Sequence, residues 1–143
     1  MAETARARAF VATTLKNDAA LQALLPSIAN RVFDRPAPQG TPYPLIRMEI
    51  LSGGNDLIVL GGARVWASPL ILVYVATDKP TTGAIEPIAD QMDALLHDAS
   101  GTVTRGVIWS CIRERGFDSP DTSTVPNVSR LGGEYRILVS QQA

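Results

Sequence analysis

Residues 31–50 read RVFDRPAPQGTPYPLIRMEI, a stretch that places four prolines and a glycine between two short apolar segments. Proline fixes φ at about −65°, lacks a backbone donor and favours an extended conformation of the residue before it, so the chain here is held semi-extended. Gly40 provides a pivot within the stretch. We expect a short β segment at residues 31–34, a rigid connector, and a strand at residues 45–51, with Tyr43 packed at the corner.

Apolar residues spaced three and four apart indicate two helical regions. The first covers residues 3–25, where Asn17 and Asp18 are expected to break the helix and cap a short second one. The second covers residues 81–99. Pro87 falls in or near its first turn, where a missing N–H costs least.

Three further stretches have the composition of strands. Residues 64–77 are nearly all apolar, which is typical of a strand at the centre of a sheet covered on both faces. Pro69 interrupts this strand, and a bulge or an unpaired edge is expected there because proline cannot donate to a ladder. Residues 104–117 and 131–140 complete the set, whereas residues 118–130, rich in Ser, Thr and Pro, are expected to be irregular.

Strands in blocks, with one helical region at the start and one in the middle, are typical of α+β proteins. We therefore expect a single domain over residues 1–143, with a mostly antiparallel sheet of about four to five strands and two helices packed on it.

Residues 52–64, SGGNDLIVLGGAR, place an apolar patch between two Gly-Gly pairs. This pattern predicts the tip of a long hairpin. Exposed apolar residues at such a tip need a cover. Two alternatives remain open: the tip folds back on its own domain, or it inserts into a groove on another copy or another protein. The patch consists of Leu57, Ile58, Val59 and Leu60.

Composition excludes several classes of function. The chain has 13 Lys and Arg residues against 14 Asp and Glu residues, a net charge of −1, and its basic residues are scattered. Binding to nucleic acid phosphates depends on a clustered basic excess, so nucleic acid is not expected as a partner. The longest apolar run, residues 69–76, is far shorter than the roughly 20 residues of a membrane span.

The chemistry of an active site is also missing from the sequence. A nucleophilic triad needs a base, and the chain has a single histidine, His97, expected to be a solvated residue near the end of a helix. The single cysteine, Cys111, shares one side of a strand pattern with Val107 and Trp109 and is expected to be a small buried hydrophobe. We predict no catalytic residue, no metal site and no cofactor.

Glu86, Asp90 and Asp93 share one face of the second helical region. Such a stripe is usually a solvated surface, but it can also meet basic residues of a neighbouring subunit and set the register between them. Arg113 and Arg115 are expected to share one strand face. They are either solvent-facing charges or the complementary side of that contact.

Three segments together resemble the phage tail-completion family, also called tail terminators or head-to-tail joining proteins. They are VFDRPAPQGTPYPLIRMEI, ARVWASPLILVYV and IEPIADQMDALLHDA. The residues that match the family pattern are Val32, Phe33, Asp34, Pro38, Gln39, Gly40, Pro42, Tyr43 and Pro44 in the first segment, and Ala89, Asp90, Met92, Leu95 and Leu96 in the helix. The apolar tip departs from the family, in which polar residues are usual there.

The resemblance implies a structural virion protein of a long-tailed phage, a prophage or a gene transfer agent. Its α+β subunits would form a ring, expected to be a hexamer, that caps the tail tube, ends tube polymerisation and joins the tail to the head neck. The implied partners are further copies of the chain, the tail tube protein and a neck or connector protein. DNA would pass through the lumen without recognition, no membrane would be involved, and assembly would take place in the bacterial cytoplasm.

A ring of identical copies uses a heterologous interface with two different patches. We expect helix and strand edges to make the ring, and the hairpin tip and residues 118–130 to point along its axis. Two other classes stay open: another virion part, such as a neck adaptor or a tail-tube subunit, and a small enzyme of unknown reaction.

Overall fold

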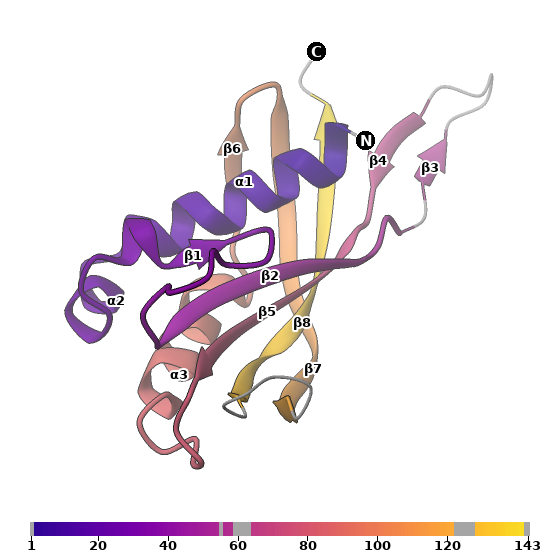
Figure 1. Cartoon of the computed structure of the whole chain (residues 1–143). Helices are drawn as coiled ribbons and strands as arrows, with labels where there is room; N and C mark the ends of the chain where they lie inside the picture. The colour runs from indigo at the N-terminus through magenta and orange to yellow at the C-terminus, as the bar shows by residue number, and fades with distance from the viewer. Residues whose placement is uncertain (1, 55, 59–63, 122–127, 142–143) are drawn as a thin grey trace.

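The computed structural model of the chain describes residues 2–54, 56–58, 64–121 and 128–141. Helices lie on one face of a curved sheet, and a two-stranded arm leaves the body (Figure 1). The described helices are α1 (Ala2–Lys16), α2 (Ala19–Leu24), the 3-10 helix η1 (Ile28–Asn30) and α3 (Glu86–Leu96). The described strands are β1 (Val32–Phe33), β2 (Leu45–Ser52), β3 (Asp56–Ile58), β4 (Arg64–Ala67), β5 (Leu70–Thr77), β6 (Gly101–Val103), β7 (Gly106–Asp121) and β8 (Val128–Gln141).

The sheet is built around β8, which is paired on both edges. One edge runs antiparallel to β5 and then to β4, and the other runs antiparallel to β7 along its full length. β2 extends the sheet beyond β5, β3 pairs with β4, and β6 pairs with β7. Among the described strands only β1 and β2 run parallel, so the predicted α+β class and mostly antiparallel sheet are confirmed. The sheet has eight strands where about four to five were expected.

Strands β4 and β5 form one continuous line along β8. Ala67 lies opposite Val139 and Leu70 opposite Arg136, so the register does not change across Pro69. The Ile137 N–H donates to the Pro69 carbonyl at 3.0 Å, and proline has no N–H to return the bond. The predicted interruption therefore takes the form of one missing ladder bond.

The predicted hairpin is present as the arm, formed by β3 and β4. It continues the β2–β5 pair after the bend at Gly53 and Gly54. Gly54 has φ +74°, and a Cβ there would overlap the Ser68 backbone, so the bend requires glycine. The backbone of Leu57 and Ile58 belongs to β3, whereas Val59 and Leu60 lie outside the described residues.

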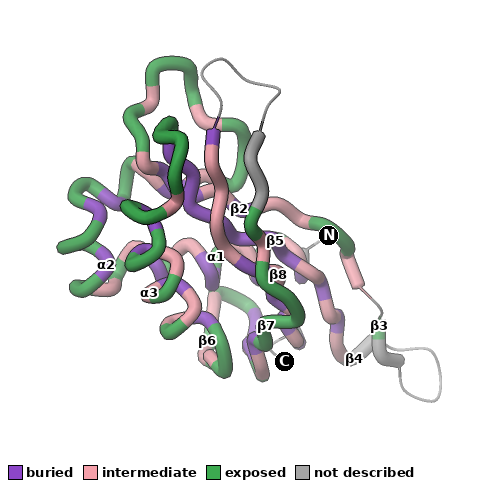
Figure 2. Tube along the Cα trace, turned by 90° about the horizontal axis from the view of Figure 1, so that it is seen from below, coloured by how far each residue is buried: buried purple, intermediate pink, exposed green. Residues whose placement is uncertain are grey.

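Two apolar clusters lie on opposite faces of β5, because successive side chains of a strand point to opposite faces. The main core lies under the helices and contains Ile71, Val73 and Val75. A smaller cluster on the other face contains Leu72 and Tyr74. All residues of β5 after Leu70 are buried, which confirms a central strand covered on both faces; Figure 2 shows this buried run through the sheet.

A bulge changes the faces of β7. The register shifts between Ile108 and Ser110, so one extra residue separates the buried positions Ile108 and Cys111. Trp109 is 55% exposed, and its Nε1–H donates to Ser140 Oγ at 2.7 Å. The expected strand face shared by Trp109 and Cys111 is therefore wrong, because the bulge places the two side chains on opposite faces.

The polar segment 118–130 is partly regular, contrary to expectation. β7 continues to Asp121, β8 begins at Val128, and the residues between them lie outside the described part. Pro120 lies opposite Ser129. The backbone N–H and C=O groups of Ser129 point toward β5, as those of Ile137 do. The missing N–H of Pro120 therefore removes no hydrogen bond between β7 and β8. A proline-containing sequence can thus form an edge strand here.

Local signals placed the helices correctly. Asp18 caps α2 by accepting a hydrogen bond from the Leu21 N–H at 2.8 Å, as predicted. α3 begins at Glu86, later than predicted, with Pro87 in its first turn. In the connector, Gly40 has φ +85° and acts as the pivot. Tyr43, expected to pack at the corner, is 38% exposed.

Helix α3 is tied to the sheet by a polar contact at the edge of the main core. The Tyr135 hydroxyl donates to Asp93 Oδ1 at 2.8 Å, and the Arg113 guanidinium lies 3.5 Å from the other carboxylate oxygen. Tyr135 is 2% exposed. Burial and the Asp93 hydrogen bond raise the pKa of Tyr135, so the hydroxyl keeps its proton and remains the donor.

Removing the two partners of this contact should have unequal effects. Tyr135→Phe should lower the free energy of unfolding by about 1 kcal/mol, whereas Asp93→Ala should lower it by about 1–3 kcal/mol because it leaves a buried hydroxyl unsatisfied. Urea unfolding followed by tryptophan fluorescence measures both. Glu86→Ala, on the exposed side of α3, is the control and should change stability little. A larger loss for Tyr135→Phe than for Asp93→Ala would contradict this account.

Gly132 allows β8 to pass close to β5, since a Cβ there would overlap the Val73 carbonyl and lie 2.6 Å from Tyr74 Cα. Gly132→Ala should therefore lower the free energy of unfolding by about 3 kcal/mol, through displacement of backbone. Gly83→Ala is a matched control, because a Cβ at Gly83 meets nothing within 4 Å. Equal stability of the two variants would show that β8 can move aside.

Candidate functional site

The single histidine and the single cysteine, the side chains most often used in catalysis, are each held within the fold. His97 is exposed at the end of α3, as predicted, and its Nδ1 accepts a hydrogen bond from the Arg113 N–H at 3.1 Å. Cys111 is fully buried, as predicted, and burial raises the pKa of its thiol to about 12. In the part of the chain that the structure describes, no group of three or more His, Cys, Asp or Glu residues is placed to hold a metal ion.

Over the described ranges, no helix is both long enough and apolar enough to cross a membrane.

The acidic stripe of α3 divides into two parts. Glu86 and Asp90 are exposed on the helix surface. Asp93 is half-buried and already engaged by Tyr135 and Arg113 of the same chain. The surface available to a partner on this helix is therefore acidic at Glu86 and Asp90, whereas Asp93 holds the helix on the sheet.

Arg113 and Arg115 lie on opposite faces of the sheet, so the expectation of one shared face is wrong. A register shift between them sets Arg113 opposite Tyr135 and Arg115 opposite Glu134. Arg113 reaches Asp93 on the helix side. The Arg115 guanidinium lies 3.2 Å from Glu134, and its side chain is 75% exposed against 15% for Glu134. The bulge that causes this adds one residue to β7 only, which no local sequence pattern indicates.

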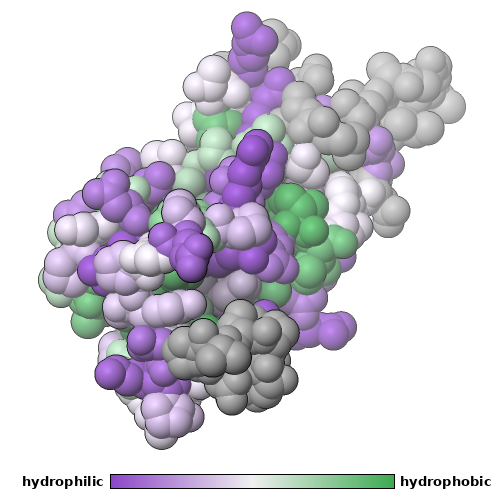
Figure 3. Space-filling view, in the orientation of Figure 1, coloured by the Kyte–Doolittle hydropathy of each residue, from purple (hydrophilic) through white to green (hydrophobic). Residues whose placement is uncertain are grey.

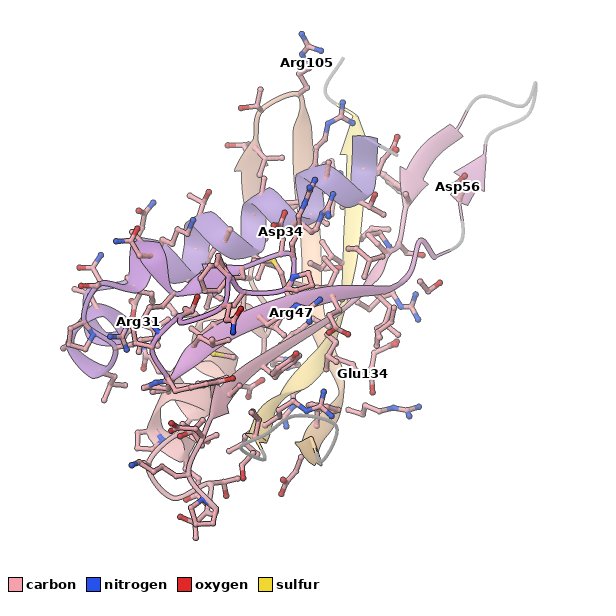
Figure 4. The ribbon with its side chains drawn as sticks, viewed as in Figure 1. Arg31, Asp34, Arg47, Asp56, Arg105 and Glu134 are labelled. Carbon is pink, nitrogen blue, oxygen red and sulfur yellow. The ribbon has the colours of Figure 1, made fainter. Side chains whose placement is uncertain are left out.

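The arm extends away from the helices and the core (Figure 1). Asp56 lies on it, well apart from Glu134 on the body of the sheet (Figure 4). Of the apolar tip predicted from sequence, only the backbone of Leu57 and Ile58 is described. Whether the tip folds back or docks elsewhere thus stays a prediction.

The sheet face turned away from the helices is covered at one end only. There Phe33, Ala37 and Phe117 pack on the smaller apolar cluster. The Arg130 guanidinium lies over the rings of Tyr74 and Phe117, with its Cζ 5.5 and 5.2 Å from their centroids.

At the other end this face carries exposed apolar side chains, which we call the bare-face patch. Leu51 is 46%, Trp109 55% and Ile112 39% exposed, and Leu70 and Leu138 are half-buried. Figure 3 shows hydrophobic side chains gathered beside the base of the arm, where β2 ends and β5 begins. Sequence reasoning missed this patch, because bulges at Leu51 and Trp109 decide which side chains it contains.

A hollow runs along α1 on the side of β6. Its volume is about 710 Å³, and it is lined by Arg6, Phe10 and Thr13 of the helix together with Thr102, Val103 and Thr104, among others. A second hollow of about 280 Å³ lies on the other flank of α1, beside Arg8 and Asp34. Neither hollow is lined by an arrangement of acid, base and nucleophile among the described residues.

Comparisons with known proteins agree with this description. The family model "Tail completion protein gp17" matches residues 9–139. A chain in a solved structure titled "Virion of native gene transfer agent (GTA) particle" has the same fold, with a TM-score of 0.72 and 18% identity over 97% of this chain and 98% of that chain. No curated protein matches the chain. Because the family match extends from α1 into β8, the chain belongs to the tail completion protein gp17 family and is a structural protein of the virion tail or neck.

Proposed function

We propose that the protein forms a ring of identical copies, a hexamer, that caps the tail tube, ends its polymerisation and joins the tail to the head neck. The observation that carries this proposal is the family match over residues 9–139. The protein acts by binding and not by catalysis. Its partners are further copies of itself, the tail tube protein and a neck or connector protein.

DNA passes through the lumen of the ring without sequence recognition. A net charge of −1 supports this part of the proposal, because a chain with balanced charge lacks the excess of basic groups that phosphate binding requires. The ring is assembled in the cytoplasm of the bacterial host before the tail meets the head.

A ring needs two different surfaces that fit each other. Glu86 and Asp90 are exposed on α3, which packs on the helix side of the sheet, and Arg115 is exposed on the opposite face. These residues are proposed ring contacts. The arm, with Leu57 to Leu60, is proposed to point along the ring axis toward the tube or the neck.

The purified protein should have about six times the 15.3 kDa mass of the chain in light scattering, and rings should be visible by negative-stain electron microscopy. Added to polymerising tail tube protein, it should bind the tube ends and stop their growth, whereas albumin at the same concentration should not. A monomer that assembles only on tube ends would also agree with the proposal. Long cylinders formed by this protein alone would identify a tube subunit instead, and absence of both rings and tube binding would refute the proposal.

Deletion of residues 55–60 tests the role of the arm separately. The shortened protein should still form rings but fail to join tails to heads, which can be measured by counting joined particles in an in vitro assembly mixture. Substitution of the same segment by an equally long Gly-Ser sequence controls for hairpin length. Unchanged joining by the deleted form would show that the arm is not a contact.

A further inference from the structure

The bare-face patch presents a fixed surface. Trp109 is oriented by its hydrogen bond to Ser140. Arg136 lies between Leu70 and Ile112 in the ladder, and its guanidinium donates to the Ser68 carbonyl at 2.9 Å and to Glu114 at 3.1 Å. With this arginine engaged by its own chain, the surface left to a partner is apolar and already ordered. Such surfaces are typical of the centre of a protein interface, where tryptophan is over-represented.

We propose that the bare-face patch is covered, in the ring, by α2 and α3 of the neighbouring copy. This inference rests on the ring proposed above and assigns its subunit contact. Each sheet would then be covered on one face by its own helices and on the other by those of the next copy.

The surface formed by α2 and α3 has the properties that the patch requires. The two helices are in contact, since the Gln91 side chain of α3 donates to Asp18, the cap of α2, at 3.0 Å. Leu24, at the end of α2, is 44% exposed. Glu86 and Asp90 are exposed on α3. Of the two helices in contact, α2 therefore contributes an exposed apolar residue and α3 two exposed acidic ones.

Charge complementarity favours a second copy as the occupant. Arg115 lies on the same sheet face as the patch, three residues along β7 from Ile112. It pairs with Glu134 of its own chain at 3.2 Å, but its side chain is 75% exposed and can meet a further carboxylate. Contact between this face and the α2–α3 side of the next copy would bring Arg115 near Glu86 and Asp90 and set the register of the two subunits. Because the two surfaces lie on opposite faces of one sheet, the contact is head to tail, as a closed ring requires.

The hollow on the β6 side of α1 is a less suitable partner for the patch. Its charged lining residue is Arg6, and the other polar residues that line it are threonines and Asn17. It offers no acid to Arg115, so we assign the contact to the other helical surface.

The apolar part of the inference is tested by Ile112→Glu, with Thr102→Glu as the matched control on an exposed position of β6. Ile112→Glu should raise the concentration for half-maximal ring assembly at least tenfold, measured by light scattering, and leave the melting temperature of the dilute subunit unchanged. Thr102→Glu should leave assembly unchanged. Loss of rings with Thr102→Glu but not with Ile112→Glu would overturn the inference in favour of the α1 hollow.

The charged part is tested by exchange. Arg115→Glu and the double change Glu86→Lys with Asp90→Lys should each weaken assembly, and the triple variant should recover most of it. Arg115→Ala, which introduces no new charge beside Glu134, should weaken assembly without recovery in the same background. Additive losses in the triple variant would overturn the pairing.

The possible outcomes separate this inference from the proposed function. Intact rings of Ile112→Glu that no longer bind tube or neck protein would overturn the inference and assign the patch to that other protein. Intact rings with full tube and neck binding would overturn the inference alone. A wild-type protein that forms rings neither alone nor on tubes would overturn both.

Discussion

The structure depends on β8 being paired along both edges. β5 and β4 occupy one edge and β7 the other, so each remaining strand joins the sheet through one of these three. Residues of β8 such as Ile137 and Val139 enter the main core, and alternate residues face the side without helices. The close approach of β5 at Gly132 leaves no room for a side chain. A single strand thus determines where both the helical layer and the bare face lie.

Much of the fold could be predicted from local sequence. The cap at Asp18, the first-turn Pro87 and the pivot at Gly40 are properties of a few consecutive residues, and the structure contains all three. The antiparallel α+β arrangement followed from the order of such elements. The short strand β6 was missed because three residues carry too little periodic signal to be distinguished from a turn.

The candidate surfaces were harder to predict from the sequence, because their composition depends on the register in which neighbouring strands pair. One extra residue in β7 moves Trp109 to the bare face, and a second register shift separates Arg113 from Arg115. Each shift is defined only relative to β8, whose partner residues lie about thirty positions away in the sequence at the first bulge and about twenty at the second. The same applies to Asp93. In the sequence it resembles the other acidic residues of the helix, but it differs from them in accepting a hydrogen bond from Tyr135 of β8.

The continuous register of β4 and β5 on β8 determines how firmly the arm is attached to the sheet. The arm is not hinged on the body at Pro69, since the ladder on both sides of this residue keeps the same alignment. A pull on the arm along the strand direction acts parallel to β8, so many hydrogen bonds resist it together and none is peeled off alone. The arm is therefore attached to the sheet through its central strand, β8, without a flexible joint at Pro69.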